Sequence, residues 1–171
     1  MTTYILISII QAMGISLGVG SSTLAILNFF YAIKDGKIEP AERGIMGVNY
    51  IVLRVAMVII LLTTAYLFVT DMVNATTITA YTYAQLTIIF VLFLNAILMT
   101  ARIMPSSFGP AIQASSWYAL GFLLTLVPHD LTDFTYVTFI ISYFGFFVFV
   151  TLLIKFVMSV LKKRSEPSQS A

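Results

Sequence analysis

The chain of 171 residues contains no cysteine and only one histidine, His129. Without thiols it cannot form disulfides, iron–sulfur clusters, thiolate metal sites or a cysteine nucleophile. One imidazole cannot supply both axial nitrogens of a bis-histidine haem, and a zinc site would need ligands that this chain lacks. We therefore expect no cofactor and no metal site.

Motifs that identify common enzyme classes are also missing. The sequence has no serine nucleophile elbow, no paired-carboxylate centre, no Walker loop and no dinucleotide fingerprint. We therefore expect that the protein is not an enzyme and that it has no catalytic residues.

Charge is scarce throughout the chain. Charged residues make up 9% of the sequence and hydrophobic residues 60%, and the mean hydropathy is +1.00. So few ionisable groups cannot cover the surface of a soluble globule of this size. The composition indicates a membrane protein, and the small net charge of +2 gives no indication of nucleic-acid binding.

Long apolar runs account for most of the sequence, and each is about twice the length of a transmembrane β-strand. The predicted fold is all-α: a polytopic bundle of five transmembrane helices forming one domain, residues 1–164, followed by a disordered tail, 165–171. Pro40 suits the first position of the second helix, and residues 71–79 are expected to form an outer loop. The expected spans are residues 4–33, 47–70, 80–104, 108–127 and 134–161.

The nine basic residues all fall on one side of this predicted bundle. They lie between the first two spans or just beyond them, at the end of the third span, and near the C-terminus. The segments that follow the second and fourth spans contain Asp71, Asp130 and Asp133 but no basic residue. This asymmetry predicts an outer N-terminus and a cytoplasmic C-terminus in a multi-pass protein of the cell membrane.

Small residues recur at spacings of three and four along the first span. They would form one flat stripe where another helix backbone can approach closely. This stripe serves packing within the subunit, a homodimer seam, or a groove that admits a ligand. The predicted helix-packing residues are Gly14, Gly18, Ser22 and Ala25.

Arg54 is the residue least suited to a lipid environment. A guanidinium at the centre of a membrane helix costs about 2.5 to 3.5 kcal/mol on insertion scales. Depending on where the second span begins, Arg54 lies about 6 Å or about 10 Å below the inner boundary of the hydrocarbon. It is either an interfacial anchor that snorkels to water or a functional cation within the membrane.

Neutral polar side chains are the expected partners of Arg54, because no span contains an acidic residue. Their amides and hydroxyls either link helices structurally or converge on Arg54 to form a pocket for an anion or a polar solute. Trp117 also needs an acceptor for its indole N–H, and it either bonds internally or stacks on a ligand. The predicted ligand-binding residues are Arg54, Asn49, Gln11, Asn95, Gln113, Ser115 and Ser116.

The first third of the chain resembles a known group of sequences in the stretches Gly18–Thr23, Phe29–Phe30 and Lys34–Ile38 and in the acidic Glu42. These stretches are similar to the opening helix and loop of small uncharacterised bacterial inner-membrane proteins, which are distantly similar to the copper-resistance D type. The resemblance implies a membrane architecture and a location in a bacterial inner membrane. The copper-resistance type would carry histidines in its helices, and the expected spans of this chain carry none.

Our leading hypothesis is a non-enzymatic integral membrane protein that is a small carrier or channel component for an anion or a polar solute. The alternatives are an accessory or scaffold subunit of a membrane complex and, third, a haem- or copper-linked redox membrane subunit. The expected partners are the lipid bilayer and either further copies of the chain or a different membrane subunit, and no nucleic acid.

Overall fold

The computed structural model describes residues 2–32, 40–76, 78–101, 103 and 108–165. The described residues form helices and turns only, as the sequence predicts. The helices are α1 (Thr2–Ala32), α2 (Pro40–Val73), α3 (Ala80–Thr100), α4 (Phe108–Leu126), the short 3₁₀ helix η1 (Val127–His129) and α5 (Tyr136–Ser165).

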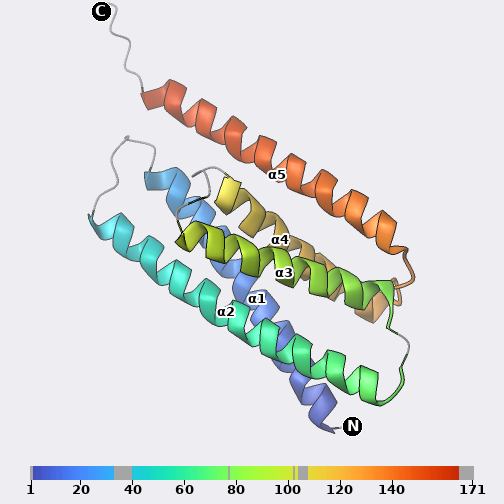
Figure 1. Ribbon diagram of the computed structural model, residues 1–171. Coiled ribbons are helices and arrows are strands. Elements are labelled where there is room, and N and C mark those ends of the chain that lie inside the picture. The colour runs from blue at the N-terminus through green and yellow to red at the C-terminus, as the bar shows by residue number, and fades with distance from the viewer. Residues whose placement is uncertain (1, 33–39, 77, 102, 104–107, 166–171) are drawn as a thin grey trace, which may run out of the picture.

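Consecutive long helices run antiparallel and form an elongated bundle (Figure 1). α1 and α2 make the most extensive helix–helix contact, and α4 packs against α1, α3 and α5. α5 lies along one side of the bundle, mainly against α4 (Figure 1). The N-terminus therefore lies at the same end of the bundle as the α2–α3 and α4–α5 connections.

Five of these helices are long and apolar enough to cross a membrane. A helix satisfies its own backbone hydrogen bonds, which is the condition for a segment to span hydrocarbon. Large apolar side chains are exposed on every one of these helices, and in lipid such exposure carries no hydrophobic penalty. The chain is thus a multi-pass membrane protein, in agreement with its composition.

The helix boundaries differ most from the expected spans at α2, which begins at Pro40, as predicted, and continues to Val73. Asp71 therefore belongs to the helix rather than to the outer loop. α2 contains 34 residues and is about 51 Å long, whereas α3 contains 21 residues and is about 32 Å long. A helix can extend beyond the hydrocarbon with its polar residues in the headgroup region, which hydropathy alone does not reveal.

The α4–α5 connection contains two local signals that fix where the helices end and begin. Asp130 follows η1 in the left-handed region, with a φ of 54°, a conformation that Asp tolerates better than most residues. The Thr135 hydroxyl then accepts a hydrogen bond of 3.2 Å from the backbone N–H of Thr138. This is a typical N-cap contact, and it starts α5 at Tyr136 rather than at the expected residue 134. Residues 33–39 and 104–107, which join or end the expected spans, lie outside the described residues. So does the expected tail, 165–171, apart from Ser165, which is the last residue of α5.

The apolar core lies where α1, α2, α3 and α4 meet. Trp117 is its largest fully buried side chain and is 1% exposed. Ile15, Ile60, Ile88 and Leu120 are buried in the same cluster.

The stripe of small residues on α1 packs against neighbouring helices of the same chain. A Cβ atom added at Gly14 would lie 2.7 Å from Cγ2 of Ile59 on α2. One added at Gly18 would collide with the six-membered ring of Trp117 on α4. Gly14 and Gly18 thus allow close packing within the subunit, which is the first of the three alternatives considered for this stripe.

We predict that Gly18→Ala destabilises the protein by about 1 to 3 kcal/mol, because the rigid indole cannot yield to the added methyl group without displacing the core. The matched control is Gly20→Ala, where a Cβ meets no atom within 4 Å. The control should be neutral or stabilising by up to about 1 kcal/mol through its better helix propensity. Thermal unfolding in detergent measures both, and equal melting temperatures for the two variants would contradict the packing described here.

Candidate functional site

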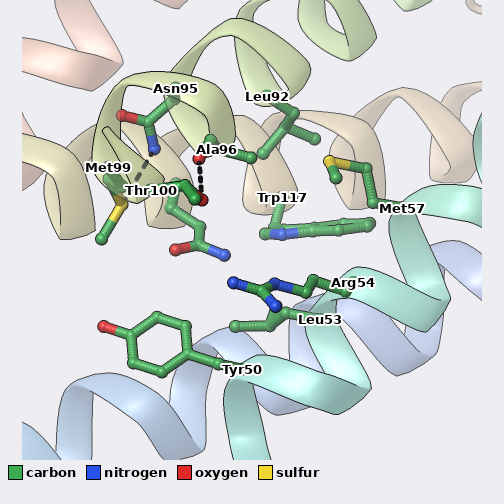
Figure 2. Close-up of a pocket in the computed structure, with 11 residues that line it drawn as sticks. Tyr50, Leu53, Arg54, Met57, Leu92, Asn95, Ala96, Met99, Thr100 and Trp117 are labelled. Atoms are coloured by element: carbon green, nitrogen blue, oxygen red, sulfur yellow. Dashed lines mark hydrogen bonds between the residues drawn. The ribbon is translucent and has the colours of Figure 1, made fainter. Parts of the chain in front are cut away.

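A cavity of about 200 Å³ lies between α2, α3 and α4 (Figure 2). Its polar lining combines one cation, one phenol, one hydroxyl, two amides and one indole. The rest of the wall is formed by aliphatic and thioether side chains. The lining residues are Tyr50, Leu53, Arg54, Met57, Leu92, Asn95, Ala96, Met99, Thr100, Gln113 and Trp117.

Helical periodicity explains which side chains share this space. Tyr50 and Met57 lie four residues before and three residues after Arg54, so all three occupy one face of α2. Gln113 and Trp117 are four residues apart on α4. On α3 the lining runs from Leu92 to Thr100, the last residue of that helix, so the cavity lies toward the C-terminal end of α3 and the N-terminal half of α4.

Arg54 lies 14 residues after the first residue of α2 and 19 before its last (54 − 40 and 73 − 54), about 21 Å along the helix from Pro40. The residue is exposed, so its side chain lies where the cavity opens. Figure 2 shows the guanidinium directed into the space below the Trp117 indole. None of the described residues that line the cavity is acidic, so the wall offers no carboxylate to neutralise the guanidinium.

The indole N–H of Trp117 is buried and has no hydrogen-bond partner among the described residues. An internal acceptor, the first of the two alternatives considered for Trp117, is therefore not found among these residues. In Figure 2 the nitrogen edge of the indole faces the same space as the guanidinium of Arg54. Burying a donor without a partner costs about 1 to 3 kcal/mol of stability. A ligand in the cavity could accept a hydrogen bond from this donor and recover part of that cost.

Asn95 links α3 to α4 at one edge of the cavity. Its Nδ2 donates a hydrogen bond of 3.0 Å to the backbone carbonyl of Gly109 and a second, of 3.6 Å, to the sulfur of Met99. Its Oδ1 has no partner among the described residues. Figure 2 shows this oxygen on the side away from Arg54 and Trp117, so Asn95 contributes mainly to the position of the wall.

A second, smaller hollow of about 40 Å³ adjoins the cavity, since Tyr50 and Gln113 line both. Ser22 and Ala25 of the α1 stripe form part of its wall, together with Phe29 and other apolar residues. Tyr50 and Gln113 thus separate the main cavity from a narrow space between α1, α2, α4 and α5.

The structure brings three of the seven predicted ligand-binding residues together in the cavity: Arg54, Asn95 and Gln113. The other four are buried at different places. Gln11 donates a hydrogen bond of 2.7 Å to the hydroxyl of Thr64, ten residues beyond Arg54 on α2. The amide nitrogen of Asn49 is buried without a partner among the described residues, and Asn49 does not line the cavity.

Ser115 and Ser116 are fully buried and face the packing between helices rather than the cavity. Both hydroxyls donate to the carbonyl of Ile112, at 3.1 Å and 2.7 Å respectively. Ser116 also lies 2.6 Å from the hydroxyl of Tyr143, which joins α4 to α5. Amides and hydroxyls in membrane helices thus serve both as structural links and as site residues in this chain.

Tyr50 and Thr100 are polar cavity residues that the sequence did not assign to a ligand site, and for Trp117 contact with a ligand was one of two alternatives. The available signal for Tyr50 and Trp117 was their helical spacing, because Tyr50 shares a face with Arg54 and Trp117 shares one with Gln113.

A larger groove of about 670 Å³ lies between α4 and α5 and is almost entirely apolar. Phe122, Phe134, Phe139 and Phe146 line it. Tyr118 and Tyr143 are also on its wall, and their hydroxyls are already bonded to Thr23 and Ser116. The groove offers a polar solute few contacts, so the cavity around Arg54 is the stronger candidate site.

The described part of the chain contains no group of three or more His, Cys, Asp or Glu residues arranged to hold a metal ion. Comparison with protein-family models, with curated proteins and with solved structures gives no match.

We predict that removing the Ser116–Tyr143 contact weakens the fold but leaves ligand binding in the cavity unchanged. In a double-mutant cycle of Ser116→Ala and Tyr143→Phe, the coupling should be about 0.6 kcal/mol, a typical value for a hydrogen bond between membrane helices. Unfolding in detergent measures the coupling, and a ligand titration of Tyr143→Phe measures binding. A tenfold loss of affinity with unchanged stability would instead place this pair in the site.

Proposed function

We propose that this protein binds a small anion or polar solute in the cavity between α2, α3 and α4, as a carrier or channel component. The observation that carries the proposal is the guanidinium of Arg54 on the wall of a cavity whose described lining contains no carboxylate. An unneutralised cation is costly in a membrane segment and marks a functional site. A bound anion would supply the missing charge.

The hydrogen-bonding groups of the cavity support this proposal. Arginine and tryptophan side chains are donors only, and the amide of Gln113 can both donate and accept. A solute with several acceptor atoms can therefore accept hydrogen bonds from these groups, whereas a cation is repelled by the charge of Arg54. Neutral polar solutes can also bind in the cavity, through hydrogen bonds with its amide and hydroxyl groups.

The accessory-subunit alternative has less support from the α1 stripe. Gly14 and Gly18 are covered by Ile59 and Trp117 of the same chain, so these two positions are not free to contact a partner helix. The exposed apolar surfaces of α5 and the other helices contact lipid or further subunits.

For the orientation we propose an outer N-terminus and a cytoplasmic C-terminus, in a bacterial inner membrane. The support is the placement of the basic residues. The α2–α3 connection contains no Lys or Arg, and the α4–α5 connection contains Asp130 and Asp133 but no Lys or Arg.

Because the chain has no native cysteine, single cysteines test this orientation cleanly. We expect Thr132→Cys to react with a membrane-impermeant maleimide in intact cells, and Ser168→Cys to react only after permeabilisation. Labelling of both residues in intact cells would refute the proposed orientation.

Arg54→Gln tests the proposed function directly. In proteoliposomes we expect it to reduce flux of small anions at least tenfold, because a hydrogen bond to a charged group contributes about 1.5 to 3 kcal/mol. Arg54→Lys should retain part of the flux, since it keeps the charge but loses the planar fork. The measurement compares nitrate, acetate, urea and glycerol against protein-free vesicles.

Lys155→Gln is the matched control for Arg54→Gln. Lys155 is another cation on a spanning helix, but its ammonium lies 5.5 Å from the centre of the Phe108 ring, away from the cavity lining. The flux of each solute through Lys155→Gln should equal that through the wild type. If folded Arg54→Gln and wild-type protein gave the same flux for every solute, the proposed role of Arg54 would be wrong.

A further inference from the structure

We infer that the ligand of the Arg54 cavity is a short-chain monocarboxylate, with its carboxylate between Arg54 and the indole N–H of Trp117 and its hydrocarbon chain against the apolar wall. This inference rests on the proposed function and narrows its solute class. It combines the donors, the single charge, the apolar wall and the volume of the cavity.

Two donors that cannot accept a hydrogen bond face the same space. The guanidinium of Arg54 presents a planar fork of N–H groups whose geometry matches a carboxylate in bidentate fashion. Trp117, which is 1% exposed, directs an unpartnered Nε1–H toward the same space (Figure 2). A carboxylate has two oxygens with about four lone-pair directions, so one group can satisfy both donors.

The charge balance of the cavity favours a monoanion. Arg54 is the only charged residue among those described that line it. One negative charge would be neutralised, whereas a second would remain unpaired in a partly buried site of low dielectric and would oppose binding. Dicarboxylates and multivalent inorganic anions are therefore expected to bind more weakly than monocarboxylates.

The wall beside the indole is apolar. Leu53, Met57 and Leu92 line the cavity with no polar atom other than the weakly accepting thioether of Met57. Figure 2 shows Leu92 and Met57 above the indole of Trp117, and Leu53 below it, next to Arg54. A fully hydrated inorganic anion would leave this wall without a partner, whereas an alkyl chain attached to the carboxylate would cover it.

The volume sets the size of the ligand that the walls can surround. A cavity of about 200 Å³ is somewhat larger than an apolar cavity of about 150 Å³ that binds benzene, so its walls can surround roughly seven non-hydrogen atoms. The carboxylate carbon and its two oxygens account for three of these atoms, which leaves about four further carbons. Butyrate and pentanoate therefore fit best.

The experiment uses the only tryptophan of the chain as the reporter. We titrate purified full-length protein in nanodiscs, at pH 7, with acetate, propionate, butyrate, pentanoate, hexanoate and octanoate and follow Trp117 fluorescence. Affinity should rise about fourfold per methylene up to butyrate or pentanoate, the value expected for burial of one CH₂ group. It should then stop rising at hexanoate and octanoate.

Three further probes separate charge from shape. Butyramide keeps the size of butyrate without its charge, nitrate keeps a planar monoanion without the alkyl chain, and succinate adds a second charge. Each should bind at least tenfold more weakly than butyrate. In Arg54→Gln the advantage of butyrate over butyramide should disappear, whereas Lys155→Gln should retain it.

Trp117→Phe keeps an aromatic ring in the core but removes the indole N–H together with part of the bicyclic ring. Calorimetry should show about a tenfold loss of affinity for butyrate with the same dependence on chain length as in the wild type. Because this variant can also perturb packing, the butyrate-to-butyramide ratio is the decisive value. It should fall in Trp117→Phe and remain unchanged in Ile88→Leu, a substitution in the same core cluster but outside the cavity lining.

The results distinguish the two proposals. If nitrate or butyramide binds as well as butyrate, with binding lost in Arg54→Gln, the cavity is a solute site but the monocarboxylate assignment is wrong. If affinity rises with chain length through octanoate equally in wild type and Arg54→Gln, the chains merely partition into lipid and the assignment is also wrong. If no anion or neutral solute binds and none is transported, the proposed function itself fails.

Discussion

The contact between Gly18 of α1 and the indole of Trp117 on α4 determines how the centre of this bundle is built. The six-membered ring of the indole occupies the space that a side chain at position 18 would need. α1 and α4 can therefore approach closely, and the pyrrole edge of the indole faces the cavity beside Arg54 (Figure 2). The same side chain is thus a core residue on one edge and a potential ligand contact on the other. Because protein interiors are close-packed, a side chain introduced at Gly18 would displace Trp117 and so alter the cavity as well as the core.

Around this centre, polar side chains divide between two roles. Gln11, Ser115 and Ser116 form hydrogen bonds with partners close by, and these bonds link or support the helices. Arg54 and Trp117 instead present donors to the cavity, where the described lining supplies no carboxylate. Helix association in lipid depends on packing and on such polar links, since apolar burial provides no driving force there. A cavity whose donors lack internal partners is consequently where function is expected.

The sequence predicts the architecture well because the signals are strong and local. Long apolar runs define the helices, and Pro40 correctly marks the start of α2. Helix ends are less predictable, since a helix can continue through the headgroup region, as α2 does to Val73. The site is only partly predictable, because Ser116 and Gln113 are both neutral polar residues of the same span. Only the rotation of α4 about its axis places Gln113 in the cavity and Ser116 against Tyr143 of α5. The burial of the Trp117 N–H without a partner depends on the packing of α1, α2, α3 and α4 together, which no single span encodes.

The unequal lengths of the helices affect how the protein fits its membrane. α3 matches a hydrocarbon core of about 30 Å, whereas α2, at about 51 Å, extends well beyond it. A helix of this length fits the bilayer by placing its ends in the headgroup region, by tilting, or by changing the local bilayer thickness. Since Arg54 lies near the middle of the long helix, the angle that α2 adopts sets the depth of the guanidinium. Lipid composition, through acyl-chain length, would thereby adjust the electrostatic environment of the cavity without any change in the protein.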